Sequence, residues 1–506
     1  MDKKNALLLG IDIGTTDTKC SVYTPEGQVV ASHFSEYSMV HPRSGWVEER
    51  PEDWWDAILR NICLCREDGV DLHRIQGICV SCTNAFIPVT REVKPLHNAI
   101  MQIDQRAARE VDWIEEHIGS EKIYAITGNR VGRGTFFMPT VLWYLHNCPE
   151  IVAEAYKFLT PSGYAVAKLT DEFTINESRM GFSLMSDIRT GQWSEELVTA
   201  MGMDMDKLPR PCRADEIVGY VTAKAAAETG LAEGTPVAGG AMDTVSAAVG
   251  AGGVAESDVF MALGTCGRIC HSTADDRFDR GIMNCRNAVQ GQYLNVDATN
   301  NCGVALRWFR DTFGAAATAI PEVAGMSIYE ALDTLAERSR PGAGGVIFLP
   351  YFSGERCPIW DPDAKGAFIG MQLGTDYGDM VRAVLEGVAF SLRQGMDRMH
   401  IEEGKPIALG GGIANSRIWC EIIANVVRHP IIRTDVNETE TLGCAILAGH
   451  AVGLIDDMGA IGKRLIAEGE TIPVDPEQMA IYDARYALYC ELYERLKPAF
   501  PRLRMA

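Results

Sequence analysis

The stretch Leu7–Lys19 (LLLGIDIGTTDTK) decides how this chain folds, because it is typical of a β-strand that runs into a turn of glycine and hydroxyl residues. Side chains alternate between the faces of a strand, so one face is aliphatic and the other carries Asp12 between Gly10 and Gly14. A carboxylate flanked by glycines favours the close approach of a large anion held through a divalent cation. An ordinary buried strand followed by a turn is the alternative.

The turn after this strand carries groups that suit phosphate oxygens. Thr15 and Thr16 offer hydroxyl groups, the turn offers backbone amides, and Lys19 adds a positive charge. This combination predicts a phosphate-binding turn.

Length and composition indicate a large globular protein. The chain has 506 residues, more than one hydrophobic core usually serves, so we expect two domains of roughly 250 residues. The formal net charge of −21 argues against binding to nucleic acid or to an anionic membrane. No apolar run approaches the roughly 20 residues of a membrane-spanning helix.

The cysteines predict a reducing environment. There are fifteen of them without regular spacing, and no secretory signal precedes Leu7, so we expect free thiols and a cytoplasmic location. Cys79 and Cys82 form a C-x-x-C pair in an apolar strand-like run. Because no second pair or nearby histidine completes a zinc site, we interpret this pair as part of the core.

The first half predicts a strand meander followed by helix and strand. Three antiparallel strands are expected at Leu7–Ile13, Lys19–Tyr23 and Gln28–His33. A helix opens at Pro51–Asp53, and the next strand covers Gly77–Val80. This order suits a mixed α/β sheet.

The second half repeats this pattern. Val259–Leu263 runs into the turn Gly264–Gly267, and Pro406–Leu409 runs into Gly410–Gly412 before an amphipathic helix. Two halves that each open with a glycine and hydroxyl turn predict duplicated domains facing one nucleotide. The small-residue stretch Ser246–Glu256 is the expected crossover between them.

A further carboxylate follows a glycine turn beside this crossover. Thr235–Asp243 (TPVAGGAMD) predicts a short strand, a turn and a helix that begins near Asp243. A helix N-cap is the simple interpretation of this aspartate, but its place favours a carboxylate in a cleft. The chain contains no G-x-x-x-x-G-K-[ST] motif and no protein-kinase catalytic loop, so another fold must bind phosphate here.

Two later motifs resemble a known family. Gly366–Met371, then seven residues, then Asp379–Glu386 is similar to the C-terminal signature of the FGGY carbohydrate kinases, and Leu349–Pro362 (LPYFSGERCPIWDP) is equally characteristic. The resemblance covers nearly the whole chain. It implies an α/β fold of two duplicated actin/hexokinase-type, ribonuclease H-like domains around a nucleotide cleft. Residues 1–250 would hold the sugar site and the catalytic aspartate, and residues 251–506 the adenosine site.

The resemblance also implies roles for single residues and, as cofactors, ATP and Mg²⁺. Asp243 matches the general base that takes a proton from the sugar hydroxyl as it attacks the γ-phosphate, and Asp12 matches the carboxylate that holds Mg²⁺ through water. The expected nucleotide-binding residues are Gly14, Thr15, Thr16, Lys19, Gly264, Thr265, Gly410, Gly411, Gly412 and Asn415.

The acceptor region departs from the family pattern. Small polar residues stand at positions 81–83, where xylulose kinases carry Gln-Met-His and glycerol kinases carry Gln-Arg-Glu. Gln102 replaces an expected tryptophan, Thr135 an expected tyrosine, and Asp17 a more usual serine or asparagine. The residues expected to contact the acceptor are Ser81, Cys82, Thr83, Gln102 and Asp243.

The leading prediction is therefore a kinase that phosphorylates a primary hydroxyl of a small sugar, with a ketopentose such as xylulose as the first candidate. Another polyol, a tetrose derivative or a sugar acid is the alternative, because the small residues at 81–83 leave room without specifying partners. A non-catalytic sugar sensor, or an ATPase of the same fold that drives conformational change, belongs to a different class. The expected partner is a small sugar or polyol, with no nucleic acid and no membrane, and a homodimer is left open.

Overall fold

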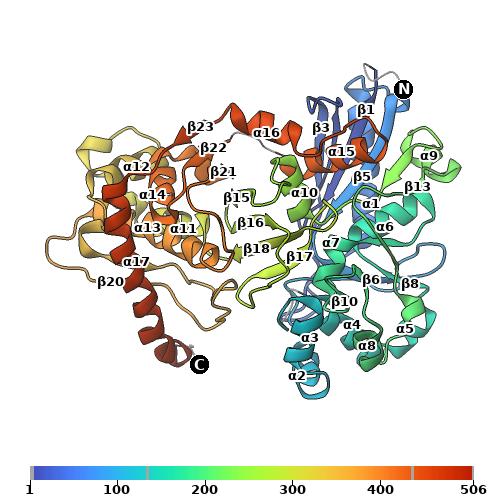
Figure 1. The fold of residues 1–506 in the computed structure, drawn as a ribbon, viewed down its shortest axis with the longest axis horizontal. Helices are drawn as coiled ribbons and strands as arrows, with labels where there is room; N and C mark the ends of the chain where they lie inside the picture. The colour runs from blue at the N-terminus through green and yellow to red at the C-terminus, as the bar shows by residue number, and fades with distance from the viewer. Residues whose placement is uncertain (1–4, 133–135, 435–437, 504–506) are drawn as a thin grey trace.

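The computed structural model describes residues 5–132, 136–434 and 438–503, and it contains two lobes that are each built on one large β-sheet (Figure 1). The first sheet has six strands in the order β13-β14-β5-β1-β2-β3. Its strands are β1 (Leu7–Ile13), β2 (Asp17–Tyr23), β3 (Val29–Glu36), β5 (Ile75–Cys82), β13 (Ile217–Tyr220) and β14 (Pro236–Ala238). The meander and the fourth strand expected from the sequence are confirmed.

The second sheet has seven strands in the order β17-β18-β16-β15-β21-β22-β23. Its strands are β15 (Val259–Leu263), β16 (Gly267–Thr273), β17 (Met283–Arg286), β18 (Tyr293–Thr299), β21 (Ile407–Gly410), β22 (Ile431–Arg433) and β23 (Glu470–Ile472). In both sheets the opening hairpin is antiparallel, its first strand lies parallel to the next strand inward, and the outermost strand is antiparallel. This shared pairing confirms the expected duplication.

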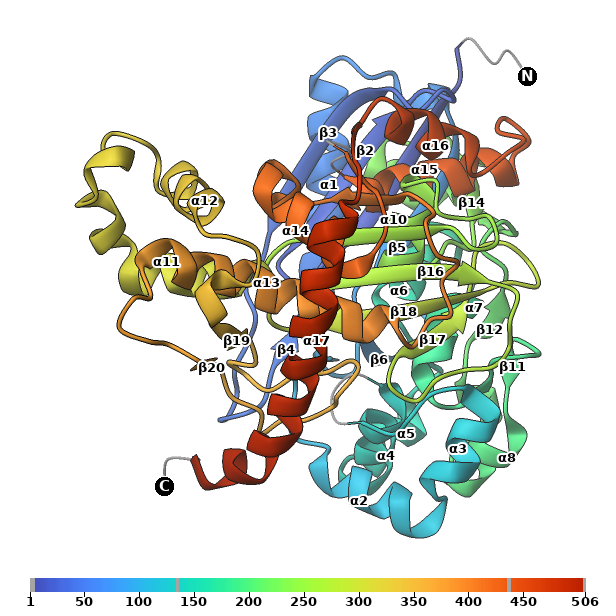
Figure 2. The same ribbon diagram turned by 60° about the vertical axis from the view of Figure 1, so that its left-hand side comes forward.

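Helices surround both sheets, and α2 to α5 with α8 gather below the first one (Figure 2). The helices of the first half are α1 (Pro51–Glu67), α2 (Ala108–His117), α3 (Ser120–Thr127), α4 (Phe137–Asn147), α5 (Pro149–Glu154), α6 (Pro161–Thr170), α7 (Glu177–Met180), α8 (Glu195–Ala200), α9 (Ala223–Thr229) and α10 (Asp243–Gly250). Those of the second half are α11 (Gly303–Thr318), α12 (Ile328–Arg338), α13 (Tyr377–Met396), α14 (Arg417–Val427), α15 (Thr439–Ala451), α16 (Ala460–Ala467) and α17 (Pro476–Leu496).

Short strands complete the architecture. A smaller four-stranded sheet of the first half contains β4 (Glu48–Glu49), β6 (Ala85–Val89), β7 (Ala99–Met101) and β8 (Lys157–Leu159). The two-stranded pairs are formed by β9 (Thr174–Asn176) with β12 (Arg210–Cys212), β10 (Ser186–Asp187) with β11 (Gln192–Trp193), and β19 (Ile347–Leu349) with β20 (Ala367–Ile369).

The family signature segment forms α13, as its periodicity predicts. Asp376 caps the helix by accepting a hydrogen bond from the Asp379 amide at 2.9 Å, and the Asp379 carboxylate accepts one from the Asp376 amide at 3.3 Å. Val384, Val388 and Leu392 are fully buried. The signature therefore specifies a capped core helix of the second lobe.

Helix α15 comes from the second half of the chain but lies against the first sheet beside α10 (Figure 1). A Cβ atom at Gly10 would lie 2.0 Å from the Thr441 carbonyl oxygen, and one at Gly443 would lie 1.8 Å from that of Ser246. The missing side chain at Gly10 thus makes room for α15 and not for a ligand. This corrects the interpretation of the glycines around Asp12. Because α15 crosses between the lobes, the division of the chain at residue 250 stays a prediction.

All fifteen cysteines are free thiols. Cys79 and Cys82 are both buried on β5, where their spacing of three places them on opposite faces of the strand. The C-x-x-C pair is therefore core, as expected. Among the helices of the described residues, none has the length and apolar character needed to cross a membrane.

Candidate active site

A cavity of about 320 Å³ lies where the opening hairpins of the two sheets meet. We call it the central cavity. The first half contributes Asp12, Gly14, Thr15, Thr83, Asn84, Gln102, Arg179, Phe182, Met242, Asp243 and Thr244, and the second half contributes Cys266, Arg268, Met283, Val296, Ala298, Arg356 and Glu440. Both predicted carboxylates therefore face one space.

Asp243 is the first residue of α10 and is held by two arginines. Its Oδ1 atom lies 3.1 Å from Nη2 of Arg179, and its Oδ2 atom lies 3.3 Å from Nη1 of Arg268. Burial alone would raise the pKa of Asp243, but the charges of Arg179 and Arg268 lower it below the ordinary carboxyl value. The N-cap position is held by Met242 and Asp243 follows it inside the helix, so the N-cap interpretation does not hold. Asp243 is an ionised proton acceptor at neutral pH.

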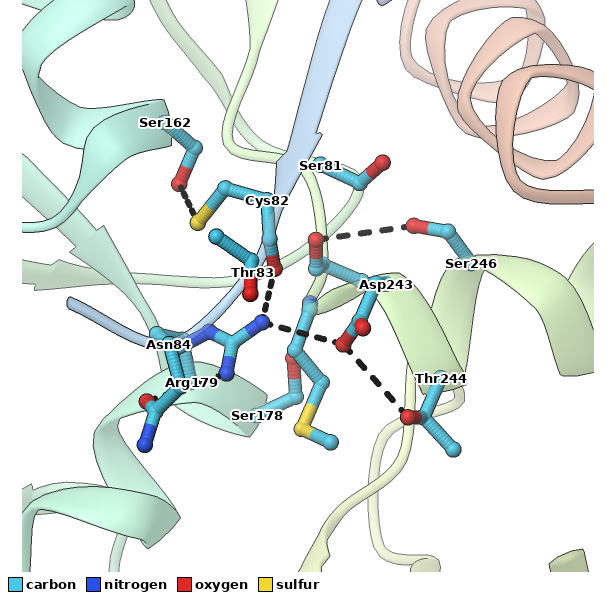
Figure 3. Close-up of polar contacts among 12 residues, drawn as sticks. Ser81, Cys82, Thr83, Asn84, Ser162, Ser178, Arg179, Asp243, Thr244 and Ser246 are labelled. Atoms are coloured by element: carbon cyan, nitrogen blue, oxygen red, sulfur yellow. Dashed lines mark hydrogen bonds and ion pairs between the residues drawn. The ribbon is translucent and has the colours of Figure 1, made fainter. Parts of the chain in front are cut away.

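Arg179 reaches Asp243 from the short helix α7 (Figure 3). Its guanidinium donates hydrogen bonds to the Cys82 carbonyl oxygen, to Oδ1 of Asn84 at 3.1 Å and to Asp243. The side chain is only 2% exposed, so it fixes the position of the carboxylate from inside the protein. Sequence reasoning missed this arginine because no motif surrounds it and its partners are distant in the chain.

Asp12 projects from the end of β1 beside Ser81 and Glu440. The Ser81 hydroxyl donates a hydrogen bond of 2.5 Å to Asp12 Oδ1. Burial, followed by the nearby charge of Glu440, raises the pKa of Asp12 to about 7. An added cation would relieve this crowding of negative charge, so the donor set fits a divalent ion.

The described residues include no cluster of three or more His, Cys, Asp or Glu side chains that could hold a metal ion alone. A divalent ion at Asp12 would therefore complete its shell with water and ligand oxygens, as Mg²⁺ does when it is bound with phosphate groups.

The structure brings together only part of the predicted acceptor set. The Thr83 hydroxyl lies 3.0 Å from that of Thr15 and lines the central cavity together with Gln102. Ser81 is buried and supports Asp12. Alternation along β5 turns Cys82 away, toward the Ser162 hydroxyl at 3.2 Å, so its assignment to the acceptor is corrected. Thr135 lies outside the described residues.

In the first predicted phosphate turn, the charges are already paired. The Gly14 amide closes the turn on the Asp17 carbonyl oxygen at 2.8 Å, and Thr16 donates a hydrogen bond to the Asp17 carboxylate at 3.2 Å. Lys19 forms an ion pair of 3.0 Å with Glu438. The backbone and Thr15 face the cavity, and a phosphate contact from Lys19 stays a prediction.

A second cavity, of about 570 Å³, lies in the other lobe. Its lining residues come from the β15–β16 turn and from four helical segments, and they are Gly264, Thr265, Gly303, Leu306, Arg307, Tyr329, Glu330, Asp333, Gly412, Ile413, Asn415, Ser416 and Trp419. The predicted residues Gly264, Thr265, Gly412 and Asn415 thus share one space. The lining residues from α11, α12 and α14 could not be found from the sequence, since they come from segments without a shared motif.

Gly410, Gly411 and Gly412, at the end of β21, differ in their surroundings. Gly412 lines the second cavity, and a Cβ atom there would meet nothing within 4 Å. Gly411 has a φ of +93°, and a Cβ atom there would lie 2.7 Å from the Leu263 carbonyl oxygen. Gly410 is buried in the strand. The turn is therefore held close to β15 while its far side stays open to a ligand.

One loop borders both cavities. Gly264 and Thr265 line the second cavity, and Cys266 lines the central one. The loop is braced from behind, because the amides of Gly303 and Val304 donate hydrogen bonds to the carbonyl oxygens of Gly264 and Thr265 at 2.8 and 3.1 Å. A ligand with a base at one end and phosphates at the other could reach from one cavity to the next across this loop.

Comparison with known proteins identifies the family. A model of the N-terminal domain of the FGGY family of carbohydrate kinases matches residues 7–250, and a model of the C-terminal domain matches residues 261–452. The chain belongs to this family. The resemblance seen in its motifs is confirmed, and with it the carbohydrate kinase activity and the duplicated α/β fold.

This FGGY kinase is similar to relatives along almost its whole length. It is 27% identical over 503 residues to a gluconokinase from Bacillus licheniformis, covering 99% of this chain and 96% of that protein. It is 29% identical over 496 residues to a xylulose kinase from Lactococcus lactis subsp. lactis, covering 96% of each. The crystal structure of a xylulose kinase from Rhodospirillum rubrum matches with a TM-score of 0.88 at 29% identity, over 98% of this chain and 99% of that one.

Proposed function

We propose that this FGGY kinase transfers the γ-phosphoryl group of ATP to a primary hydroxyl of a small sugar, with Asp243 as the general base. The observation that carries this proposal is the ionised Asp243 carboxylate in a cavity that adjoins a second one across the loop 264–266. The acceptor oxygen forms a bond to the γ-phosphorus, its proton passes to Asp243, and the bond to the bridging oxygen breaks as ADP leaves. Positioning and charge neutralisation provide most of the catalysis in such reactions.

The adenosine of ATP is proposed to lie in the second cavity, between the turn at Gly412–Asn415 and helices α11 and α12. Its phosphates would then follow the loop 264–266 toward Thr15 in the central cavity. Asp12 would hold Mg²⁺, which when bound neutralises phosphate charge. The lowered pKa of Asp243 does not prevent its role, because the sugar hydroxyl becomes acidic only as the new bond forms.

A ketopentose such as xylulose is the first candidate acceptor. The proposal is supported by the relatives named xylulose kinase, which this chain matches over 96% of its length or more. Thr83, Asn84 and Gln102 offer hydroxyl and amide groups to sugar hydroxyls, and Phe182 with Met283 supplies an apolar wall.

A sugar acid is the second candidate, and Arg356 favours it. This side chain lines the central cavity and donates one hydrogen bond, from Nε to Asn300 Oδ1 at 2.7 Å. Within the described part of the chain, no carboxylate lies within ion-pair distance of its guanidinium, so the terminal nitrogens could receive a substrate carboxylate. The relative named gluconokinase supports the same candidate.

The experiment that tests the proposal is a screen for ADP release by the purified protein with Mg²⁺ and ATP. The acceptor panel contains ketopentoses, tetroses, polyols and aldonic acids, and an Asp243→Asn preparation serves as the blank for contaminating kinases. We expect acceptor-dependent ADP release that is highest with a ketopentose. Highest release with an aldonic acid, lost in Arg356→Met, would select the second candidate. ADP release that no acceptor stimulates would reject the kinase proposal in favour of an ATPase or a sensor.

A further inference from the structure

The two opening hairpins place a cation at the same internal position. In the first hairpin Asp12 on β1 lies opposite Lys19 on β2, and in the second Ala262 on β15 lies opposite Arg268 on β16. Asp12 and Ala262 each stand two residues before the glycine of a Gly-Thr turn. Lys19 and Arg268 are therefore equivalent in the duplicated fold.

Only one of these cations lines the central cavity. Lys19 is paired with Glu438 at 3.0 Å and is not among the residues that line the cavity. Arg268 lines it, and its Nη1 atom donates a hydrogen bond of 2.9 Å to the Thr244 hydroxyl while lying 3.3 Å from Asp243 Oδ2. Its Nη2 atom stands 3.8 Å from Glu440. The guanidinium thus lies between Asp243 and Glu440 at the wall of the central cavity, which Cys266 of the loop 264–266 also lines.

The geometry of phosphoryl transfer requires the γ-phosphate near this guanidinium. An acceptor oxygen within hydrogen-bond reach of Asp243 lies about 3 Å from the carboxylate, and the γ-phosphorus lies about 3 to 3.5 Å beyond that oxygen. The transferred group is then within roughly 6.5 Å of the Asp243 carboxylate, whose Oδ2 atom Arg268 already contacts. A planar guanidinium can donate to a carboxylate and a phosphate oxygen at once.

Arg179 cannot take this place, although it also contacts Asp243. Its side chain is 2% exposed, against 34% for Arg268, and its terminal atoms Nη1 and Nη2 already donate to Asn84, the Cys82 carbonyl and Asp243. The two arginines therefore divide the work, since Arg179 positions the base and Arg268 can turn toward an arriving phosphate.

We propose that Arg268 contacts the transferred phosphoryl group and stabilises its charge, the role that the sequence pattern suggests for Lys19. The proposal rests on the proposed kinase reaction. As the γ-phosphorus leaves the bridging oxygen of ADP for the acceptor oxygen, negative charge is spread over its three other oxygens. Donors aimed at that charge stabilise the transition state more than the ground state.

The test measures binding of ADP with aluminium fluoride, a mimic of the transferred group, and of ADP alone, by calorimetry with Mg²⁺ present. The variants are Arg268→Met, Arg268→Lys and Lys19→Met. We expect Arg268→Met to weaken binding of the mimic by about 10² to 10³ while ADP binding changes less than about threefold. Arg268→Lys should recover part of the lost affinity for the mimic. In Lys19→Met the affinity for the mimic should fall less than a tenth as much as in Arg268→Met.

Arg286→Met is the matched control. Arg286 on β17 pairs with Glu177 of α7 at 2.6 Å, so it also joins the two halves of the chain, but it does not line the central cavity. It should bind the mimic as the unchanged protein does. Thermal unfolding of each variant shows whether the fold is retained.

The same variants are assayed for slow ATP hydrolysis without any sugar, where water replaces the acceptor. Hydrolysis should fall in Arg268→Met by a factor similar to the loss of mimic binding. Equal mimic affinity in Arg268→Met and the unchanged protein overturns the proposal, as does a change confined to the KM of the sugar. If the unchanged protein binds the mimic but phosphorylates no sugar, the kinase proposal fails while the inference about Arg268 survives.

Discussion

The two cavities of this protein are built in different ways. Charged side chains from dispersed elements line the central cavity, where Asp12, Asp243 and Glu440 face three arginines. The second cavity consists largely of turn backbone and helix ends, with Gly264 and Gly412 at its surface. In the first, the position of each charge depends on a partner. In the second, the backbone of two glycine turns forms part of the wall, so the two cavities should respond differently to substitution.

The largest effect is expected from Asp243→Asn. The amide keeps the shape of the side chain but accepts no proton, so phosphorylation should fall by about 10² to 10⁴ while ATP affinity changes little. Acceptor-dependent ADP release and calorimetry with a non-hydrolysable ATP analogue measure the two quantities. Asp276→Asn removes an exposed carboxylate that pairs with Arg189 and lines neither cavity, and this variant should behave as the unchanged protein. Turnover near the original rate in Asp243→Asn would contradict the assignment of the base.

The next effect concerns the metal. Asp12→Ala should raise the Mg²⁺ concentration needed for half-maximal activity by about 10- to 100-fold, because it removes the carboxylate that the ion would contact through water. Binding of free sugar should change far less, since Asp12 faces Ser81 and Glu440. Magnesium titration at fixed ATP, with sugar binding followed separately, tests this. An unchanged magnesium requirement would leave Asp12 a purely structural role.

Within the second cavity, two neighbouring glycines give a matched pair. Gly412→Val adds a side chain that projects into open space, so the KM for ATP should rise about tenfold, or about 1.4 kcal/mol, with stability and kcat nearly unchanged. Gly411→Val meets the Leu263 carbonyl at a positive φ and should lower the melting temperature instead. The KM for ATP and the melting temperature of both variants test these two expectations. A loss of kcat in Gly412→Val would show that the two cavities do not separate binding from chemistry.

The smallest effect is a pH dependence of stability. Folding raises the pKa of Asp12 from 3.8 to about 7, so ionising it costs stability progressively as the pH rises from about 4 to 7. Asp12→Asn removes this cost. Its gain in melting temperature over the unchanged protein, in magnesium-free buffer, should therefore be a few degrees larger at pH 8 than at pH 5. An equal gain at both pH values would mean that neither burial nor the charge of Glu440 raises the pKa of Asp12.

Contiguous motifs were sufficient to predict much of this protein from its sequence. The hairpin at Leu7–Tyr23, the turn at Gly410–Asn415 and the capped helix after Asp376 all appear where the pattern places them. Each depends on alternation, glycine conformation or capping, which act over a few residues. Asp12 and Asp243 could be singled out for the same reason, since each follows a local strand and glycine pattern.

Only the tertiary structure decided which charges meet and what each buried face touches. Gly10 admits α15, which lies more than 400 residues further along the chain, and Lys19 is paired with Glu438 across a similar distance. Alternation places Ser81 and Cys82 on opposite faces of β5, but both faces are buried, so the sequence could not tell which of the two residues faces Asp12. Arg268 reaches Asp243 only because the second hairpin is folded against the first lobe. Local patterns specify an element and its faces, whereas the long-range arrangement of elements supplies the partners that give each charge its role.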